Sequence, residues 1–237
     1  MSEMKNAVGA GTGRSGDDLC AGNSVREFKI WADVLNYGKK ILKNAGIVEA
    51  DLDAWYLFEQ SFGISRAQYF LCARENIVGS TAQKMTAQEQ TGNSLESKNA
   101  LDCVELWLKE KLSAYEHALK KRAARIPLQQ IIGQQEFMGL TFFVNEHVLI
   151  PRQDTETLVE LVLQEQKDKD ISILDMCTGS GCIAVSLKEL GGYAHVEGAD
   201  ISEEALKVAR KNAADAGRNR QTGSHRRVWR RSGESDH

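Results

Sequence analysis

The stretch that decides the fold is ILDMCTGSGCIA, residues 173–184. An apolar run at 171–176 reaches a tight glycine loop, and residues 183–190 follow with the apolar spacing of a helix. A second apolar run, residues 194–199, closes on Asp200, and residues 203–213 again have helical spacing. This order of strand, glycine loop, helix and strand predicts a β-α-β unit of a parallel sheet.

The loop has the pattern D-x-x-x-G-x-G between a strand and a helix, which is the context of a nucleotide-type site. Glycines let the backbone approach a ligand closely, and a helix start presents free N–H groups. Asp200 ends the next strand, where a carboxylate can accept hydrogen bonds from ribose hydroxyls. A methyl donor with an adenosine half and a carboxylate half suits this geometry. We therefore predict an S-adenosylmethionine site made of Asp175, Cys177, Thr178, Gly179, Ser180, Gly181 and Asp200.

Two other interpretations of the loop are weaker. A purely structural turn with an acidic residue nearby would not require the strand, loop, helix, second strand and terminal Asp200 together. A dinucleotide enzyme would need the G-x-G-x-x-G spacing that seats a pyrophosphate, and the loop lacks it.

The fold class that we predict is α/β, with an N-terminal helical bundle followed by a partial Rossmann-like methyltransferase domain. The ranges are a disordered N-terminus at 1–26, a helical domain at 27–125, a β-hairpin linker at 126–152, the partial domain at 153–214 and an aberrant, disordered tail at 215–237. Gly46 and Gly63 are expected to end the first two helices, and Pro127 to end the last. The aromatic residues of the bundle favour a core over a partner surface; they are Trp31, Trp55, Tyr56, Phe58 and Phe62.

Composition excludes several classes of protein. The net charge of −3 gives no reason to expect nucleic acid or an anionic membrane as a partner. No apolar run reaches about 18 residues, so we expect no transmembrane helix. The five cysteines lack metal-ligand spacing and predict free thiols in a reducing cytoplasm, with no metal site. Cys177 and Cys182 are expected to pack as small apolar residues, and the chain to be a monomer.

Three upstream segments carry a narrower resemblance. They are RIPLQQIIG (125–133), EFMGL (136–140) and VLIPRQDTE (148–156). Together with the glycine loop, they resemble the peptide chain release factor N(5)-glutamine methyltransferases, which are class I S-adenosylmethionine-dependent methyltransferases. The resemblance covers roughly residues 27–214. It implies methylation of the glutamine side-chain amide in the Gly-Gly-Gln motif of a release factor, the protein partner that the helical domain helps to grip. It also places Arg152 and Glu156 near the active site, where a surface salt bridge or a helix-dipole role is an equal alternative.

The chain departs from the family pattern in one important respect. The family positions the acceptor amide with an Asn-Pro-Pro-Tyr motif, but the only two prolines here are Pro127 and Pro151. We therefore assign no catalytic residue. Residues 215–237 hold six Arg and no Lys, so we interpret the chain as C-terminally truncated, with a shifted reading frame beginning near 214–217.

Three functions follow from this sequence. The first is release factor glutamine methylation at the level of the family. The second is an inactive chain that at most binds a release factor, with weak or absent cofactor binding. The third is adenine methylation of nucleic acid, against which the VLIPR segment and the acidic net charge argue. A nucleic-acid arm formed by the arginines of the tail is a further, weaker alternative.

Overall fold

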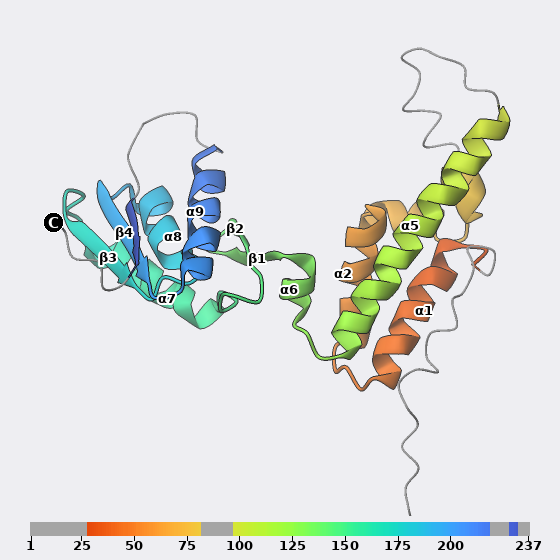
Figure 1. Cartoon of the computed structure of the whole chain (residues 1–237), viewed down its shortest axis with the longest axis horizontal. Helices are drawn as coiled ribbons and strands as arrows, with labels where there is room; N and C mark the ends of the chain where they lie inside the picture. Colours follow the sequence, from red (N-terminus) through yellow and green to blue (C-terminus); the bar gives the residue numbers. More distant parts are fainter. Residues whose placement is uncertain (1–27, 82–96, 219–227, 232–237) are drawn as a thin grey trace, which may run out of the picture.

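The structure, a computed structural model, describes residues 28–81, 97–218 and 228–231. These residues form an N-terminal helical bundle and a C-terminal α/β unit, with a short helix and a β-hairpin between them (Figure 1). The segment expected to be disordered, 1–26, lies outside the described residues, as does 82–96 of the polar stretch before the long helix. No helix within the described ranges is both long and apolar enough to cross a membrane.

The bundle contains α1 (Trp31–Asn44), α2 (Ala50–Phe62), α3 (Arg66–Cys72) and the long α5 (Ser97–Ala123). Residues 77–81 are also helical. Four of the five aromatic residues that were predicted to form a core are buried, at no more than 6% exposure: Trp31, Trp55, Phe58 and Phe62. The fifth, Tyr56, is 43% exposed. The core prediction is therefore confirmed for four of them.

A glycine brings α1 and α5 close together. A Cβ atom added to Gly38 would lie 2.0 Å from the hydroxyl oxygen of Tyr115. Tyr115 is fully buried, its hydroxyl donates to the backbone oxygen of Ala54 at 3.2 Å, and burial raises its pKa. Because Ala54 belongs to α2, one tyrosine fixes the packing of three helices. Gly46 and Gly63 follow α1 and α2 with φ near +66°, which confirms their predicted role as helix stops.

Arg125 closes the bundle at the end of α5. Its guanidinium donates to the backbone oxygens of Gly46 and Ala45, each at 3.0 Å. The short helix α6 (Leu128–Ile132) then begins directly after Pro127. The RIPL segment thus joins the bundle to the linker. Pro127 follows the end of α5, as predicted, and also precedes the first residue of α6.

The linker contains the predicted hairpin. Strands β1 (Gln134–Phe137) and β2 (Leu140–Phe143) pair antiparallel, with Phe137 opposite Leu140. The two turn residues, Met138 and Gly139, have φ of 53° and 71°. Left-handed residues at both positions are what a two-residue hairpin turn of type I′ requires.

The α/β unit contains α7 (Gln153–Glu165), β3 (Ser172–Met176), α8 (Cys182–Gly191), β4 (His195–Asp200), α9 (Glu203–Arg218) and β5 (Val228–Arg231). The three strands are parallel in the order β3-β4-β5. Ile173 and Val196 of the sheet pack into one core with Val159 of α7 and Val185 of α8. The helices therefore cover one face of the sheet.

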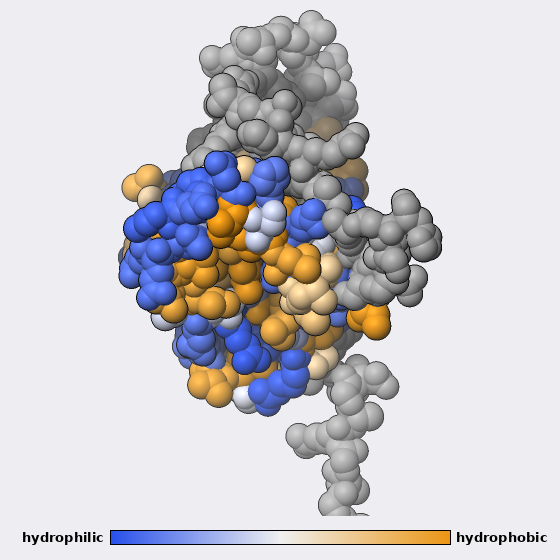
Figure 2. Space-filling model, turned by 90° about the vertical axis from the view of Figure 1, so that its left-hand side faces the viewer, coloured by the Kyte–Doolittle hydropathy of each residue, from blue (hydrophilic) through white to orange (hydrophobic). Residues whose placement is uncertain are grey.

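On the opposite face of the sheet, β3 carries two exposed apolar side chains. Leu174 and Met176 of β3 alternate with the core-facing Ile173 and are 56% and 57% exposed. The same end of the molecule carries Ile201, which is 74% exposed. Figure 2 views this end and shows a band of hydrophobic surface between hydrophilic margins. The sheet thus presents an apolar surface of the kind that other protein segments cover.

Two parts of the range 215–237, which we expected to be disordered, have regular secondary structure. Residues 215–218, expected to be irregular, continue α9, which has an unbroken helical backbone to Arg218. Val228–Arg231, also expected to be irregular, form β5 and pair with Glu197–Asp200 of β4. A free parallel edge on β4 explains the second difference, since such an edge offers backbone donors and acceptors whatever side chains the partner carries. The remaining tail residues lie outside the described ranges.

Candidate functional site

The glycine loop lies between the carboxyl ends of β3 and β4. Gly179 donates its backbone N–H to Oδ2 of Asp200 at 2.9 Å. The backbone N–H of Thr178 donates to the backbone oxygen of Ala199, also at 2.9 Å. The structure therefore brings the loop and Asp200 together, as the sequence pattern predicts for neighbouring parallel strands. Asp200 itself is 8% exposed.

Asp200 also holds the start of the next helix. Its Oδ1 accepts from the backbone N–H of Ser202 at 2.9 Å, and Ser202 Oγ accepts from the backbone N–H of Ala205 at 3.2 Å. One carboxylate thus uses its two oxygens to fix the glycine loop and the turn into α9. The sequence analysis gave Asp200 a ligand-binding role only, so this anchoring role is an addition.

Asp175 faces the same loop from β3. Thr178 Oγ1 donates to its Oδ2 at 2.7 Å, and the backbone N–H of Ala184 in α8 donates to its carboxylate. Burial raises the pKa of Asp175, and repulsion from Asp200 adds to the increase, whereas the two hydrogen bonds oppose it. The helix start of α8 is therefore already engaged by a carboxylate.

This charge arrangement discriminates between the two ligand classes considered for the loop. A pyrophosphate at the start of α8 would meet the carboxylate of Asp175, with that of Asp200 close by, and like charges repel. A ligand that carries positive charge and ribose hydroxyls would instead relieve the repulsion between the two carboxylates. S-adenosylmethionine carries a sulfonium and an ammonium group beside its one carboxylate, whereas a pyrophosphate is only anionic, so the site fits S-adenosylmethionine better than a dinucleotide.

The loop backbone has three left-handed residues in close succession. Gly179 and Gly181 have φ of 55° and 79°, and Cys177 has φ of 62°. A left-handed non-glycine residue is strained, and such strain is concentrated at functional sites. The expectation that both cysteines pack as apolar residues holds for Cys182, which is buried, but is wrong for Cys177, which is exposed.

The rest of the loop is buried and held from α9. Ser180 is 2% exposed, and its backbone oxygen accepts from Asn212 Nδ2 at 2.9 Å. Sequence reasoning missed Asn212. A signal was present, since Asn212 shares the helix face of the buried Ala209 and Val208, where a polar residue needs partners.

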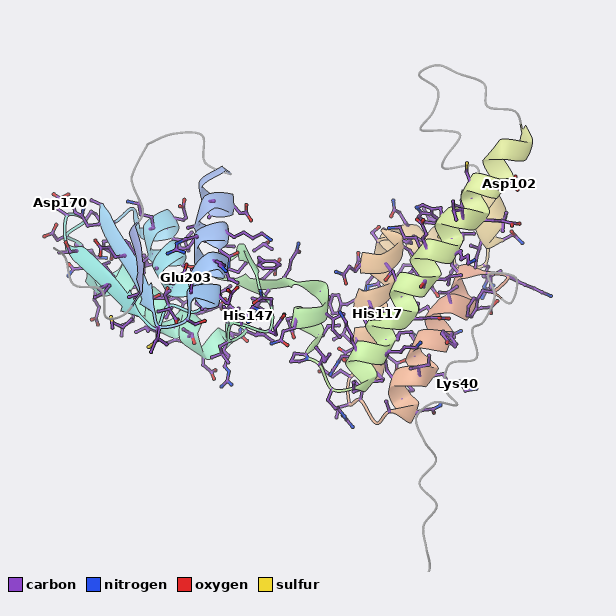
Figure 3. The ribbon with its side chains drawn as sticks, viewed as in Figure 1. Lys40, Asp102, His117, His147, Asp170 and Glu203 are labelled. Atoms are coloured by element: carbon purple, nitrogen blue, oxygen red, sulfur yellow. The ribbon has the colours of Figure 1, made fainter. Side chains whose placement is uncertain are left out.

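The upstream segments meet at the hairpin and not at the loop. Glu156, in the first turn of α7, accepts from the backbone N–H of Met138 at 2.6 Å. Of the alternatives for Glu156, the helix-dipole role agrees with its place in the first turn of α7, and the active-site border stays a prediction. His147 and Glu203 are labelled in Figure 3, which shows the segment after the hairpin beside the start of α9. Val144 and Val148 of this segment share a small core with Ala205 and Val208.

In the described part of the chain, no three His, Cys, Asp or Glu side chains gather as a metal site would need.

Comparison with known proteins agrees with this geometry. A family model described as a methyltransferase domain matches residues 167–222, and one described as the PrmC N-terminal domain matches residues 33–88. The first match includes the whole glycine loop and Asp200, and the second lies on the bundle.

Three relatives carry the name release factor glutamine methyltransferase. The protein of Streptococcus pneumoniae is 46% identical over 109 residues, which is 46% of this chain and 39% of the relative. That of Leptospira interrogans is 47% identical over 103 residues, or 43% of this chain and 36% of the relative. That of Deinococcus radiodurans is 32% identical over 186 residues, or 78% of this chain and 56% of the relative. The chain thus spans about half, or less, of the length of these relatives.

The parallel sheet, the glycine loop and the acidic strand ends define the α/β unit as a methyltransferase domain. The helical bundle before this unit matches the model described as the PrmC N-terminal domain, which restricts the kind of methyltransferase further. Both parts of the chain match the release factor glutamine methyltransferases, the bundle through the family's N-terminal model and most of the chain through the relatives of that name.

Proposed function

We propose that this chain acts in the S-adenosylmethionine-dependent methylation of a glutamine side-chain amide in a peptide chain release factor. The observation that carries the proposal is the glycine loop clamped between Asp175 and Asp200. This clamp lies in the range matched by the methyltransferase family model, and the bundle is the part matched by the family's N-terminal model.

When bound, S-adenosylmethionine supplies an electrophilic methyl group on a positively charged sulfur. Within this chain, Asp200 is placed to accept from ribose hydroxyls through the lone pairs that the backbone N–H groups of Gly179 and Ser202 leave available. Asp175 contributes negative charge beside the loop, which favours a cationic ligand. Beside the left-handed Gly179 there is open space, since an added Cβ would have only the backbone oxygen of Cys177, at 4.0 Å, within 4 Å, and a ligand can approach the backbone there.

The glutamine amide that receives the methyl group is harder for such an enzyme to activate than the S-adenosylmethionine that supplies it. The amide nitrogen is a poor nucleophile because its lone pair is delocalised into the carbonyl group. An enzyme must therefore orient the amide and accept its N–H donors. The resemblance assigns that task to an Asn-Pro-Pro-Tyr motif, and in this sequence neither Pro127 nor Pro151 is followed by a second proline.

That observation favours a second candidate function, in which the chain at most binds a release factor and transfers no methyl group. The bundle supports the binding part, since its compact core keeps α1, α2 and α5 in a fixed arrangement. The two candidates differ in one measurable step, the appearance of a methylated glutamine.

The test uses the purified 237-residue chain, a release factor with an intact Gly-Gly-Gln loop and S-adenosylmethionine. Mass spectrometry of the loop peptide reports methylation, and calorimetry reports binding of the release factor. Methylated glutamine that disappears with Asp200→Asn, but not with the exposed Asp170→Asn, supports the first function. Release factor binding without methylation supports the second. Methylation of DNA in place of the peptide, or no interaction with the release factor, refutes both.

A further inference from the structure

Asn212 of α9 is a buried amide with an unusual number of backbone partners. It is 3% exposed. Its Oδ1 accepts from the backbone N–H of Phe143 at 2.7 Å, and its Nδ2 donates to the backbone oxygen of Phe143 at 2.9 Å. The same Nδ2 donates to the backbone oxygen of Ser180 at 2.9 Å. Both N–H bonds and the carbonyl of this amide are therefore engaged.

The two hydrogen bonds to Phe143 occupy the place that the backbone of a neighbouring strand would take. Phe143 ends β2 and lies opposite Gln134 of β1, and its N–H and C=O both bond Asn212. The side-chain amide thus satisfies the outer edge of the hairpin as a neighbouring strand would. The ring of Phe143 is also fixed from α9, because the ammonium of Lys211 lies 3.4 Å from its centroid.

The third bond reaches a different functional element. Ser180 lies between Gly179 and Gly181 in the cofactor loop. Its carbonyl group shares the nitrogen atom of Asn212 with the carbonyl group of Phe143. A movement of the hairpin edge must therefore move the amide, and the amide holds the loop. Glu156 holds the turn of the hairpin, because it accepts from the backbone N–H of Met138.

We propose that Asn212 is a positioning residue that couples the hairpin linker to the cofactor loop. Because the linker continues into the helical bundle, docking of a protein substrate on the bundle would change the geometry in which the loop holds its ligand. Binding of that ligand would in turn change how the bundle holds the substrate. The physical coupling stands on the hydrogen bonds alone. Its catalytic meaning rests on the proposed function.

Asn212→Asp tests the coupling with little change of size. The carboxylate still accepts from Phe143 N–H, but its second oxygen faces the backbone oxygens of Phe143 and Ser180, where Nδ2 donated before. We expect amide hydrogen exchange to become about tenfold faster both in residues 140–144 and in residues 177–183, since buried carbonyl groups lose their donor. The control Glu156→Ala removes the other anchor of the hairpin, and exchange should then increase at 136–140 while 177–183 stay unchanged.

Two results would overturn the proposal. One is faster exchange at 140–144 in Asn212→Asp with no change at 177–183. The other is faster exchange at 177–183 in Glu156→Ala. If Asn212→Asp does not fold, the side-chain amide protons of Asn212 in the unaltered chain decide: they should exchange more slowly than those of the exposed Asn44, and equal rates would refute the bonds. None of these readouts needs the cofactor. A failure of S-adenosylmethionine binding would therefore refute the proposed function, while the exchange measurements would still decide the coupling by Asn212.

Discussion

Asp200→Asn is the substitution whose effect follows most directly from the geometry of the site. The carboxylate accepts one backbone N–H on each oxygen, from Gly179 and from Ser202, both at 2.9 Å. An amide offers one acceptor oxygen, and its NH₂ group must face the other N–H donor. The substitution therefore removes one charge-assisted hydrogen bond and leaves one partly buried backbone N–H, of Gly179 or Ser202, without its acceptor.

The cost can be worked out in two steps. A hydrogen bond to a charged group contributes about 2 kcal/mol to the free energy of unfolding. For a unit the size of the α/β unit, that loss lowers the melting temperature by roughly 10 °C. The bundle has its own core, made of residues from α1, α2, α3, α5 and α6, so its transition should not shift.

Differential scanning calorimetry of the two variants checks this estimate. Asp200→Asn should lower the melting temperature of the α/β unit only. The matched control is Asp170→Asn, which makes the same charge change at an exposed position at the far end of the α/β unit (Figure 3). A shift in Asp200→Asn no larger than that of the control would refute the anchoring role of the carboxylate.

Three further predictions concern other parts of the chain. Gly38→Ala should lower the free energy of unfolding of the bundle by about 2 kcal/mol in urea denaturation, because the new Cβ would overlap the hydroxyl of Tyr115; an unchanged midpoint would contradict the close packing. Cys177→Gly should raise the stability of the α/β unit by about 0.5 kcal/mol, since glycine relieves the strain of φ 62°, and a loss of stability would show that the strain is absent. The pKa of Asp175, followed by NMR at its carboxyl carbon, should lie above the ordinary value of 3.8. The contribution of Asp175 to stability should therefore be largest below pH 3.8 and be lost as the pH rises through the raised pKa. A midpoint at or below 3.8 would be inconsistent with the burial of this carboxyl group.

The sequence predicts the fold well where a local pattern and the tertiary structure agree. Gly46 and Gly63 end helices because only a residue without Cβ adopts the left-handed conformation at low cost. The β-α-β unit around the glycine loop is predictable for a similar reason. Asp175 is the last residue but one of β3 and Asp200 is the last of β4, so the parallel sheet places both carboxylates near the carboxyl ends of neighbouring strands.

The contacts that span long sequence distances were not predictable in the same way. Asn212 reaches Phe143 and Ser180 only because α9 packs beside the hairpin and the loop, and no local pattern encodes that packing. Arg125 likewise caps the end of α1 across the bundle. The strand at Val228–Arg231 was missed because its composition is basic, whereas its pairing with β4 uses backbone groups.

The most direct test of the central claim is an NMR titration of the ¹⁵N-labelled chain with S-adenosylmethionine, read at the amides of the glycine loop and the turn after β4. We predict saturable shifts at residues 177–182 and at 201–202, whether the affinity is high or low, and weaker binding by Asp200→Asn than by Asp170→Asn. The absence of shifts in these two segments at millimolar ligand, or equal shifts with a dinucleotide, would contradict the account.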